Sequence, residues 1–199
     1  MKTEKEKSIL RTIIEGPSFG YTDNFPKREM WKEIANEMHG KFEIKFNSGS
    51  EIEIHEITIP HKKWNIRISI SDCKPLKFKI LFVSDFDFEL IISWEDIVAR
   101  IIKKFSKSEI ELGWTEFDSH YLVKSNWSDL AKKIITIEIQ ETLLKHEVYS
   151  MSYQSDTKAG TAELISVIQR KAGTKDSVLE LIDLFKLLID NLENSRIIK

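Results

Sequence analysis

The chain has 199 residues, of which 41% are hydrophobic and 31% are charged. This length is enough for one domain with a sizeable core, and the balance of residue types excludes wholesale disorder. The formal net charge is −2 and neither sign forms a long run, which argues against a dedicated nucleic-acid binder. A single cysteine excludes an intrachain disulfide and a cysteine-based zinc cluster.

The first residues predict a peripheral element of the fold. Residues 3–15 read as a short charged helix ended by Gly16-Pro17, so we expect residues 1–24 to form a peripheral helix and loop of a single domain spanning residues 1–199. The apolar stretch near the start is short and is interrupted by Arg11, unlike a signal peptide. The sequence nowhere reaches the roughly 18 consecutive apolar residues that a spanning helix needs. We therefore expect a cytoplasmic protein without a membrane span.

The period of the apolar residues changes at Gly40. Before it, Asn24 and Pro26 give start signals for a helix whose apolar residues recur at helical spacing. After it, apolar and charged residues alternate, which predicts strands over residues 42–46, 52–59 and 64–70. The parity slips within the second of these strands, and we expect a β-bulge near His55-Glu56.

Two neighbouring alternations predict a hairpin. Residues 78–82 and 86–90 both place aromatic or aliphatic side chains at every second position. Matching their apolar faces requires a connection at residues 83–85. This register sets Ile80 opposite Phe88 and Lys79 opposite Glu89, an oppositely charged pair on the solvated face.

The second half of the sequence mixes helical and strand patterns. Helices are predicted over residues 93–105 and 175–193, and strands over residues 117–124, 149–153 and 164–169. A further helix is predicted from residue 126, and it either continues to about Lys145 or breaks before a second helical stretch that ends there. Thr174 is placed to cap the last helix. The whole pattern predicts an α+β fold, in which a predominantly antiparallel sheet of about six or seven strands is covered by helices and followed by a long C-terminal helix.

The last helix carries more leucine than one buried face needs. Its apolar residues form one broad stripe, but Leu187 falls almost opposite that stripe and Leu184 lies between. A helix packed on one side only would leave Leu187 in water. We therefore expect Leu184 and Leu187 to make a second contact, either with the N-terminal segment or with a partner subunit in a homo-oligomer.

One segment, WTEFDSHY at residues 114–121, places ionisable side chains at every second position. On a strand, Glu116, Asp118 and His120 share one face, where they could bind a divalent metal or pair an acid with a base. Side chains on the same face of a strand lie about 7 Å apart, so three of them reach one ion only if the strand twists strongly. The competing interpretations are a solvated strand face and a structural cap or turn role for Asp118.

Other residues capable of chemistry lack partners at the spacings that known sites use. His55 and His61 bracket EITIP without an HxxxH, HExxH or HxH arrangement, and Cys73 has no identifiable base. The sequence contains no phosphate-binding glycine loop and no nucleophile elbow. We therefore expect no cofactor and no metal.

Three segments of the sequence carry a shared set of motifs. The segment EIELGWTEFDSHYLVKSNWSDLAKKII has an FD pair, then an aromatic residue, a V-K-S strand end and a short helix. Upstream lie a hairpin followed by a helix in FKILFVSDFDFELIISWEDIVARII, and a helix, a glycine and an entry strand in EIANEMHGKFEIKF. In these motifs the sequence resembles small uncharacterised bacterial α+β proteins. The resemblance spans residues 25–135, and Trp114 departs from the small or acidic residue of the pattern. It implies a structural role for Asp118 and transfers no catalytic residue.

These observations favour a non-catalytic binding or scaffolding protein that works through its sheet surface or its C-terminal helix. The alternative is a metal-dependent or acid–base hydrolase centred on Glu116, Asp118 and His120, joined by His55 or His61. A third interpretation is contact with a membrane surface or a nucleic acid through a set of basic residues. These are Lys62, Lys63, Lys74, Lys77 and Lys79.

Overall fold

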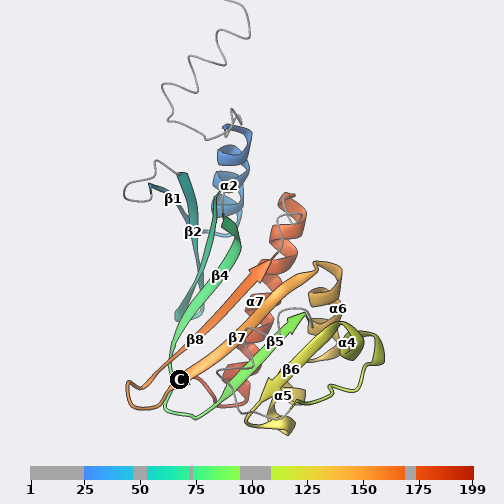
Figure 1. Cartoon of the computed structure of the whole chain (residues 1–199). Helices are drawn as coiled ribbons and strands as arrows, with labels where there is room; N and C mark the ends of the chain where they lie inside the picture. The colour runs from blue at the N-terminus through green and yellow to red at the C-terminus, as the bar shows by residue number, and fades with distance from the viewer. Residues whose placement is uncertain (1–24, 47–52, 72–73, 95–108, 169–173) are drawn as a thin grey trace, which may run out of the picture.

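The computed structural model describes residues 25–46, 53–71, 74–94, 109–168 and 174–199 (Figure 1). Within these ranges, eight strands form one sheet in the order β1-β2-β3-β4-β8-β7-β5-β6, and every neighbouring pair is antiparallel. The strands are β1 (Lys41–Phe46), β2 (Glu53–His61), β3 (Trp64–Ser71), β4 (Lys74–Val83), β5 (Glu89–Trp94), β6 (Tyr121–Ser125), β7 (Val148–Asp156) and β8 (Thr161–Ile168). The helices are α2 (Phe25–Glu37), α4 (Thr115–His120), α5 (Ser128–Ile134), α6 (Ile137–Lys145) and α7 (Lys175–Asn194). The predicted α+β fold with its long C-terminal helix is confirmed, and the strand count exceeds the prediction.

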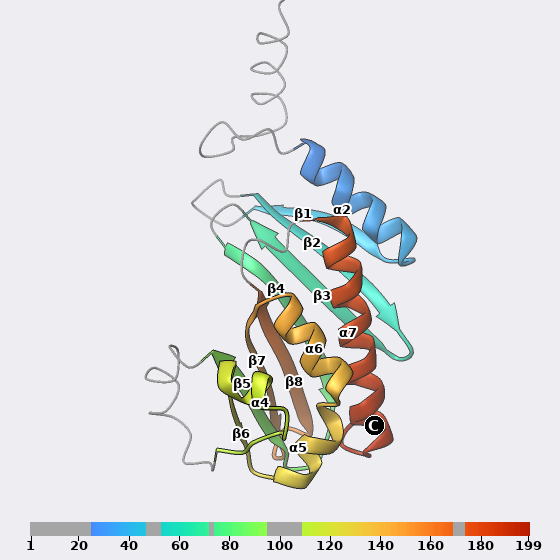
Figure 2. The same ribbon diagram turned by 90° about the vertical axis from the view of Figure 1, so that its right-hand side faces the viewer.

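The described helices cover one face of the sheet, with α7 running across the strands (Figure 2). Alternate residues of the strands enter the core below them, as Phe78 does when it stacks on Phe185 of α7 with ring centroids 4.4 Å apart. The predicted cap of α7 is confirmed, because the Thr174 side chain accepts a hydrogen bond from the Ser177 backbone N–H. No described helix is long and apolar enough to cross a membrane.

The predicted bulge near His55-Glu56 is wrong, because β2 pairs with both neighbours without a break. The parity slip has another cause. Glu53 and His55 occupy inward positions in phase with Ile57 and Ile59, and all four side chains are buried. Polar residues therefore take two core positions at the start of the strand.

The predicted hairpin between residues 78–82 and 86–90 is also wrong. β4 pairs with β8, so Lys79 lies opposite Ile165, while β5 lies between β6 and β7. The connection between β4 and β5 instead crosses the end of the β7–β8 hairpin, where the Phe88 backbone N–H donates to Ser155 Oγ at 3.1 Å. The alternation of apolar and polar residues predicts which side chains of a strand face the core. It does not predict which strand pairs with which, because several strands of this sheet have the same alternation.

Two further predictions fall partly or wholly outside the described residues. Ser93 and Trp94, expected to begin a helix, end strand β5 instead, and residues 95–108 lie outside the described residues. The predicted peripheral helix and loop at residues 1–24 also lie outside them.

Candidate functional site on the face of the sheet opposite the helices

The prediction of a strand that begins at residue 117 is wrong for the WTEFDSHY segment. Thr115–His120 form the short helix α4, and β6 begins at Tyr121. The Asp118 carboxylate accepts hydrogen bonds from the Leu112 and Gly113 backbone N–H groups, both at 2.9 Å. Gly113 has φ of +96°, a conformation that favours glycine. Asp118 therefore stabilises the turn that precedes α4, which agrees with the cap or turn role that was one of the interpretations of the sequence.

Glu116 and His120 do not join Asp118 in a site. Both are exposed, and the His120 ring donates from Nδ1 to the backbone carbonyl of Glu116 at 2.8 Å. Successive helical residues are turned by about 100°, so Asp118 leaves α4 on the side opposite to Glu116 and His120, which are four residues apart and share a face. Among the described residues, no group of three or more His, Cys, Asp and Glu side chains could hold a metal ion.

A buried polar cluster that the sequence analysis missed joins α2 to β2. Both carboxylate oxygens of Glu53 accept hydrogen bonds from the Arg28 guanidinium, with 2.7 Å from Nε to Oε1, and His55 Nε2 contacts the same carboxylate. The three side chains are only 11%, 4% and 7% exposed for Arg28, Glu53 and His55. Burial alone would raise the pKa of Glu53, but the hydrogen bonds from Arg28 and His55 outweigh it and hold the pKa below its usual value.

The histidines considered for the hydrolase are engaged in separate pairs. His55 belongs to the buried cluster, whereas His61 Nε2 lies 3.0 Å from Asp190 Oδ1 of α7. The structure does not bring either histidine together with Glu116, Asp118 and His120. His61 therefore connects β2 to α7, whereas His55 contacts the Glu53 carboxylate of its own strand.

On the face of the sheet opposite the described helices, the central strands carry basic side chains next to exposed aliphatic ones. Arg67, Lys79 and Ile165 lie directly opposite one another across β3, β4 and β8. Leu81 and Val83 follow Lys79 at alternate positions of β4 and are 53% and 62% exposed. We call this region the open face; its outward residues are Asn65, Arg67 and Ser69 on β3, Lys77, Lys79, Leu81 and Val83 on β4, and Glu163, Ile165 and Val167 on β8.

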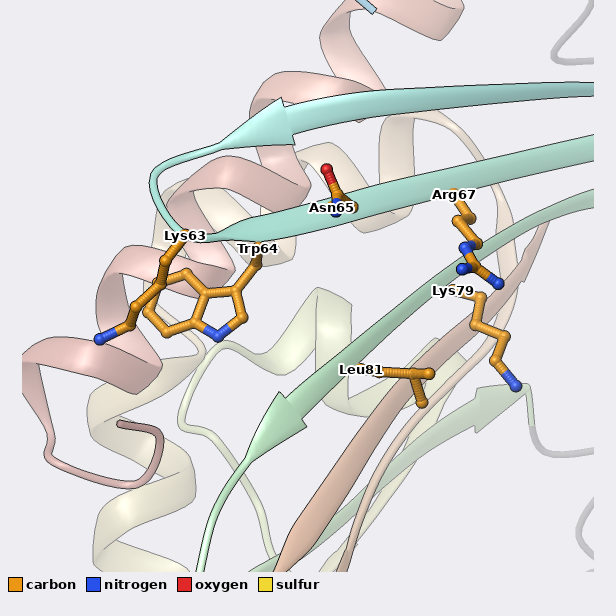
Figure 3. Close-up of a pocket in the computed structure, with 6 residues that line it drawn as sticks. All are labelled: Lys63, Trp64, Asn65, Arg67, Lys79 and Leu81. Carbon is orange, nitrogen blue, oxygen red and sulfur yellow. The ribbon is translucent and has the colours of Figure 1, made fainter. Parts of the chain in front are cut away.

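A hollow of about 140 Å³ opens in this face where β3 and β4 separate. Their paired register ends at Arg67 and Lys79, although β3 begins at Trp64 and β4 continues to Val83. Figure 3 shows Arg67 and Lys79 at one end of the hollow, Lys63 and Trp64 at the other, and Asn65 and Leu81 between them. Ligand pockets typically enclose roughly 300–1,000 Å³, so this hollow suits a single side chain better than a whole small molecule.

The indole of Trp64 closes one end of the hollow. Its ring is buried, meets the ring of Phe82 edge-on at 5.8 Å, and lies 4.7 Å from Lys63 Nζ. Trp64 therefore joins the core on one side and the hollow on the other, which gives the hollow a rigid apolar wall.

The cations of this region differ in how far they are neutralised. Lys62 forms ion pairs with Asp190 and Glu193 of α7, and Lys79 forms one with Glu163. Neither Arg67 nor Lys77 makes a side-chain ion pair with another described residue. The positive charge available on the open face is therefore concentrated at Arg67 and Lys77.

The two leucines singled out on the last helix have mainly internal contacts. Leu184 is 4% exposed and belongs to the core, and Leu187 is half-buried against it. Both line a groove shared with Thr142 and Lys145 of α6. The second contact expected for them, with the N-terminal segment or a partner subunit, stays a prediction, because residues 1–24 lie outside the described residues.

Comparison with known proteins adds information on the fold. No family model matches the sequence, and no curated protein matches it. The fold is similar to the crystal structure of the mycobacterial trehalose monomycolate transport factor A, TtfA, with a TM-score of 0.54 and 8% sequence identity. The match covers 83% of this chain and 93% of the other. At this identity the similarity concerns the fold alone.

Proposed function

We propose that this chain is a non-catalytic binding protein that holds a protein partner on its open face. The observation that carries the proposal is the pair of aliphatic side chains on β4, Leu81 and Val83, which are more than half exposed beside a group of cations. An aliphatic centre bordered by charged side chains is typical of the surfaces through which proteins bind one another.

The dimensions of the open face suit one segment of a partner. β3 and β8 have eight residues each, about 27 Å at strand spacing, and the three strands span about 10 Å between their outer axes. A helix with its side chains is about 10–12 Å across. A single helix of a partner therefore matches the open face in width, as α7 covers the opposite face of the sheet.

The hydrolase alternative has less support from the described residues. Asp118 leaves the short helix α4 on the side opposite to Glu116 and His120, and its carboxylate is occupied by backbone N–H groups. A catalytic acid and base must reach the same substrate atoms. The binding proposal does not need such convergence.

Site-specific photo-crosslinking tests the binding proposal. A photoreactive amino acid at position 83 should give one discrete adduct in cell lysate, whereas the same group at Lys132, exposed on α5, should not. The captured protein, once purified, should bind the wild-type chain and lose affinity for Leu81→Asp in calorimetry. Equal capture from both positions, or unchanged binding by Leu81→Asp, would contradict the proposal.

We also propose a cytoplasmic location, supported by the single cysteine, and test it by cell fractionation. Self-association through α7 is the weaker proposal, because Leu184 is buried within the chain. The mass of the chain in solution, measured by light scattering, tests it directly.

A further inference from the structure

The centre of the open face places two cations in an unfavourable arrangement. Arg67 and Lys79 are direct cross-strand partners, and like charges at such positions destabilise a sheet. Lys79 is partly compensated by Glu163 of the next strand, but Arg67 is exposed and lacks a carboxylate partner among the described residues. A bound anionic group would relieve this repulsion.

From this arrangement we infer that the hollow receives a carboxylate from an acidic segment of the protein partner. This inference rests on the proposed function and specifies the chemistry of the partner. The Arg67 guanidinium presents a planar fork of N–H donors, which matches a carboxylate in geometry and charge. Lys77 lies on the same face, opposite Ser69, and adds a second uncompensated cation beside the hollow.

The apolar side chains around the hollow specify the rest of the segment. Leu81 lines the hollow, and Val83 follows at the next outward position of β4. Ile165 of β8 lies opposite Lys79 and is half-buried. A segment that places an aspartate or glutamate in the hollow therefore sets aliphatic side chains against these three residues, and Arg67 selects for the acidic residue.

A polyanion fits this surface less well than an acidic protein segment. Glu163 stands within the open face, and Glu43 and Glu56 lie opposite each other on the neighbouring strands β1 and β2. Binding to a nucleic-acid duplex typically neutralises several phosphates. These carboxylates instead occupy Lys79 and Lys45, so that Arg67 and Lys77 are the cations of the open face that lack an ion pair with a described residue. A membrane surface presents the same difficulty, since its anionic headgroups extend over the whole contact area.

Selection from a random peptide library tests the inference while the natural partner is still unidentified. The full chain is immobilised and the library, with peptides long enough to cross the open face, is selected on it and in parallel on Arg67→Gln and Lys132→Gln. Peptides enriched on the wild type should combine Asp or Glu with aliphatic residues. Their affinity, measured by fluorescence anisotropy, should fall about 10-fold or more for Arg67→Gln and should change little for the matched control Lys132→Gln.

Different failures point to different errors. Peptides that need Leu81 but carry no acidic residue, or bind Arg67→Gln unchanged, overturn this inference and leave the proposed function standing. If no enriched peptide depends on Leu81, the proposed function fails and the inference fails with it. Binding of phosphatidylglycerol vesicles or a single-stranded oligonucleotide that depends on Arg67, without acidic peptides, overturns the inference in favour of a polyanion. Arg67 and Leu81 are both exposed, so their variants should fold, and circular dichroism checks this.

Discussion

Replacing Arg28 with methionine should destabilise the fold by about 2–4 kcal/mol at neutral pH. The change removes both guanidinium contacts to Glu53 and leaves a carboxylate that is only 4% exposed. Breaking a buried ion pair from one side typically costs about 3–5 kcal/mol, and His55 keeps part of the hydrogen bonding here, which lowers the expected cost. Urea denaturation of the wild type and the variant measures the difference.

Two comparisons separate this explanation from a loss of packing. The double variant Arg28→Met with Glu53→Met should be more stable than Arg28→Met alone, since the buried carboxylate that Arg28→Met leaves without the guanidinium is removed as well. Lys32→Met, on the same helix, removes an exposed ion pair to Glu29 and should change stability by less than about 0.5 kcal/mol. A double variant less stable than Arg28→Met would refute the reasoning.

The pH dependence follows from the lowered pKa of Glu53. A carboxyl group whose pKa is lower in the folded state contributes its full stabilisation above its unfolded value of 4.5, and loses it as the pH falls toward the folded value. The gap between wild type and Arg28→Met should therefore shrink as the pH is lowered below 4.5. A gap that stays constant across this range would mean that the Glu53 charge contributes little.

Three further outcomes are expected. Asp118→Ala should lower the free energy of unfolding by about 1–2 kcal/mol, because the Leu112 and Gly113 N–H groups lose their acceptor. It should leave the affinity of the selected peptides unchanged, and a loss of affinity would indicate a functional role for Asp118. Leu184→Ala should cost about 2–4 kcal/mol in urea denaturation without altering the mass in solution, since this side chain is buried within the chain; a smaller mass would restore the homo-oligomer hypothesis. Burial raises the pKa of Tyr121 and of Tyr153 to about 12. Because the tyrosines of the unfolded chain ionise at lower pH, the free energy of unfolding should fall as the pH rises from about 10 to about 12. Ultraviolet titration should show both side chains ionising above pH 10, and ionisation at the pH of a free tyrosine would contradict the burial.

The sequence predicted those elements whose periodicity is long and unambiguous. The α7 helix was located within a residue at its end, because its apolar residues recur at helical spacing over about five turns and Thr174 supplies a cap. The faces of β3 were also correct, since Trp64, Ile66 and Ile68 are buried and the intervening residues are exposed. What the sequence did not contain was the partner of each strand.

The misread WTEFDSHY segment shows the limit of short patterns. Alternation over a few residues fits a strand, but Phe117 and Tyr121 are also four residues apart, a helical spacing, and their rings stack at 4.7 Å. The conclusion drawn from alternation placed three ionisable groups on one face. The helix turns Asp118 away from Glu116 and His120, and the hydrolase hypothesis loses most of its geometric basis with that change.

The buried cluster was missed because its members are distant in sequence, although a signal was present. Arg28 and Glu53 are 25 residues apart, and nothing local links them. The break in alternation at the start of β2 arises because two polar residues occupy core positions there. A β-bulge would produce the same break in the sequence pattern. A buried carboxylate requires a cation, and an arginine on a preceding amphipathic helix was available to provide it.

Alternate residues of strand β4 face the core and the opposite side of the sheet. Its even-numbered residues from Leu76 to Phe82 are buried against the helices, whereas Lys77, Lys79, Leu81 and Val83 face outward. A surface needed only for solubility is satisfied by polar side chains, and nothing in the core requires an exposed leucine and valine beside opposed cations. Because the two sets of side chains point to opposite faces, the outward set can change while the inward set maintains the fold. The outward residues can thus be altered with little cost in stability, which is the condition that a test of the proposed binding face requires.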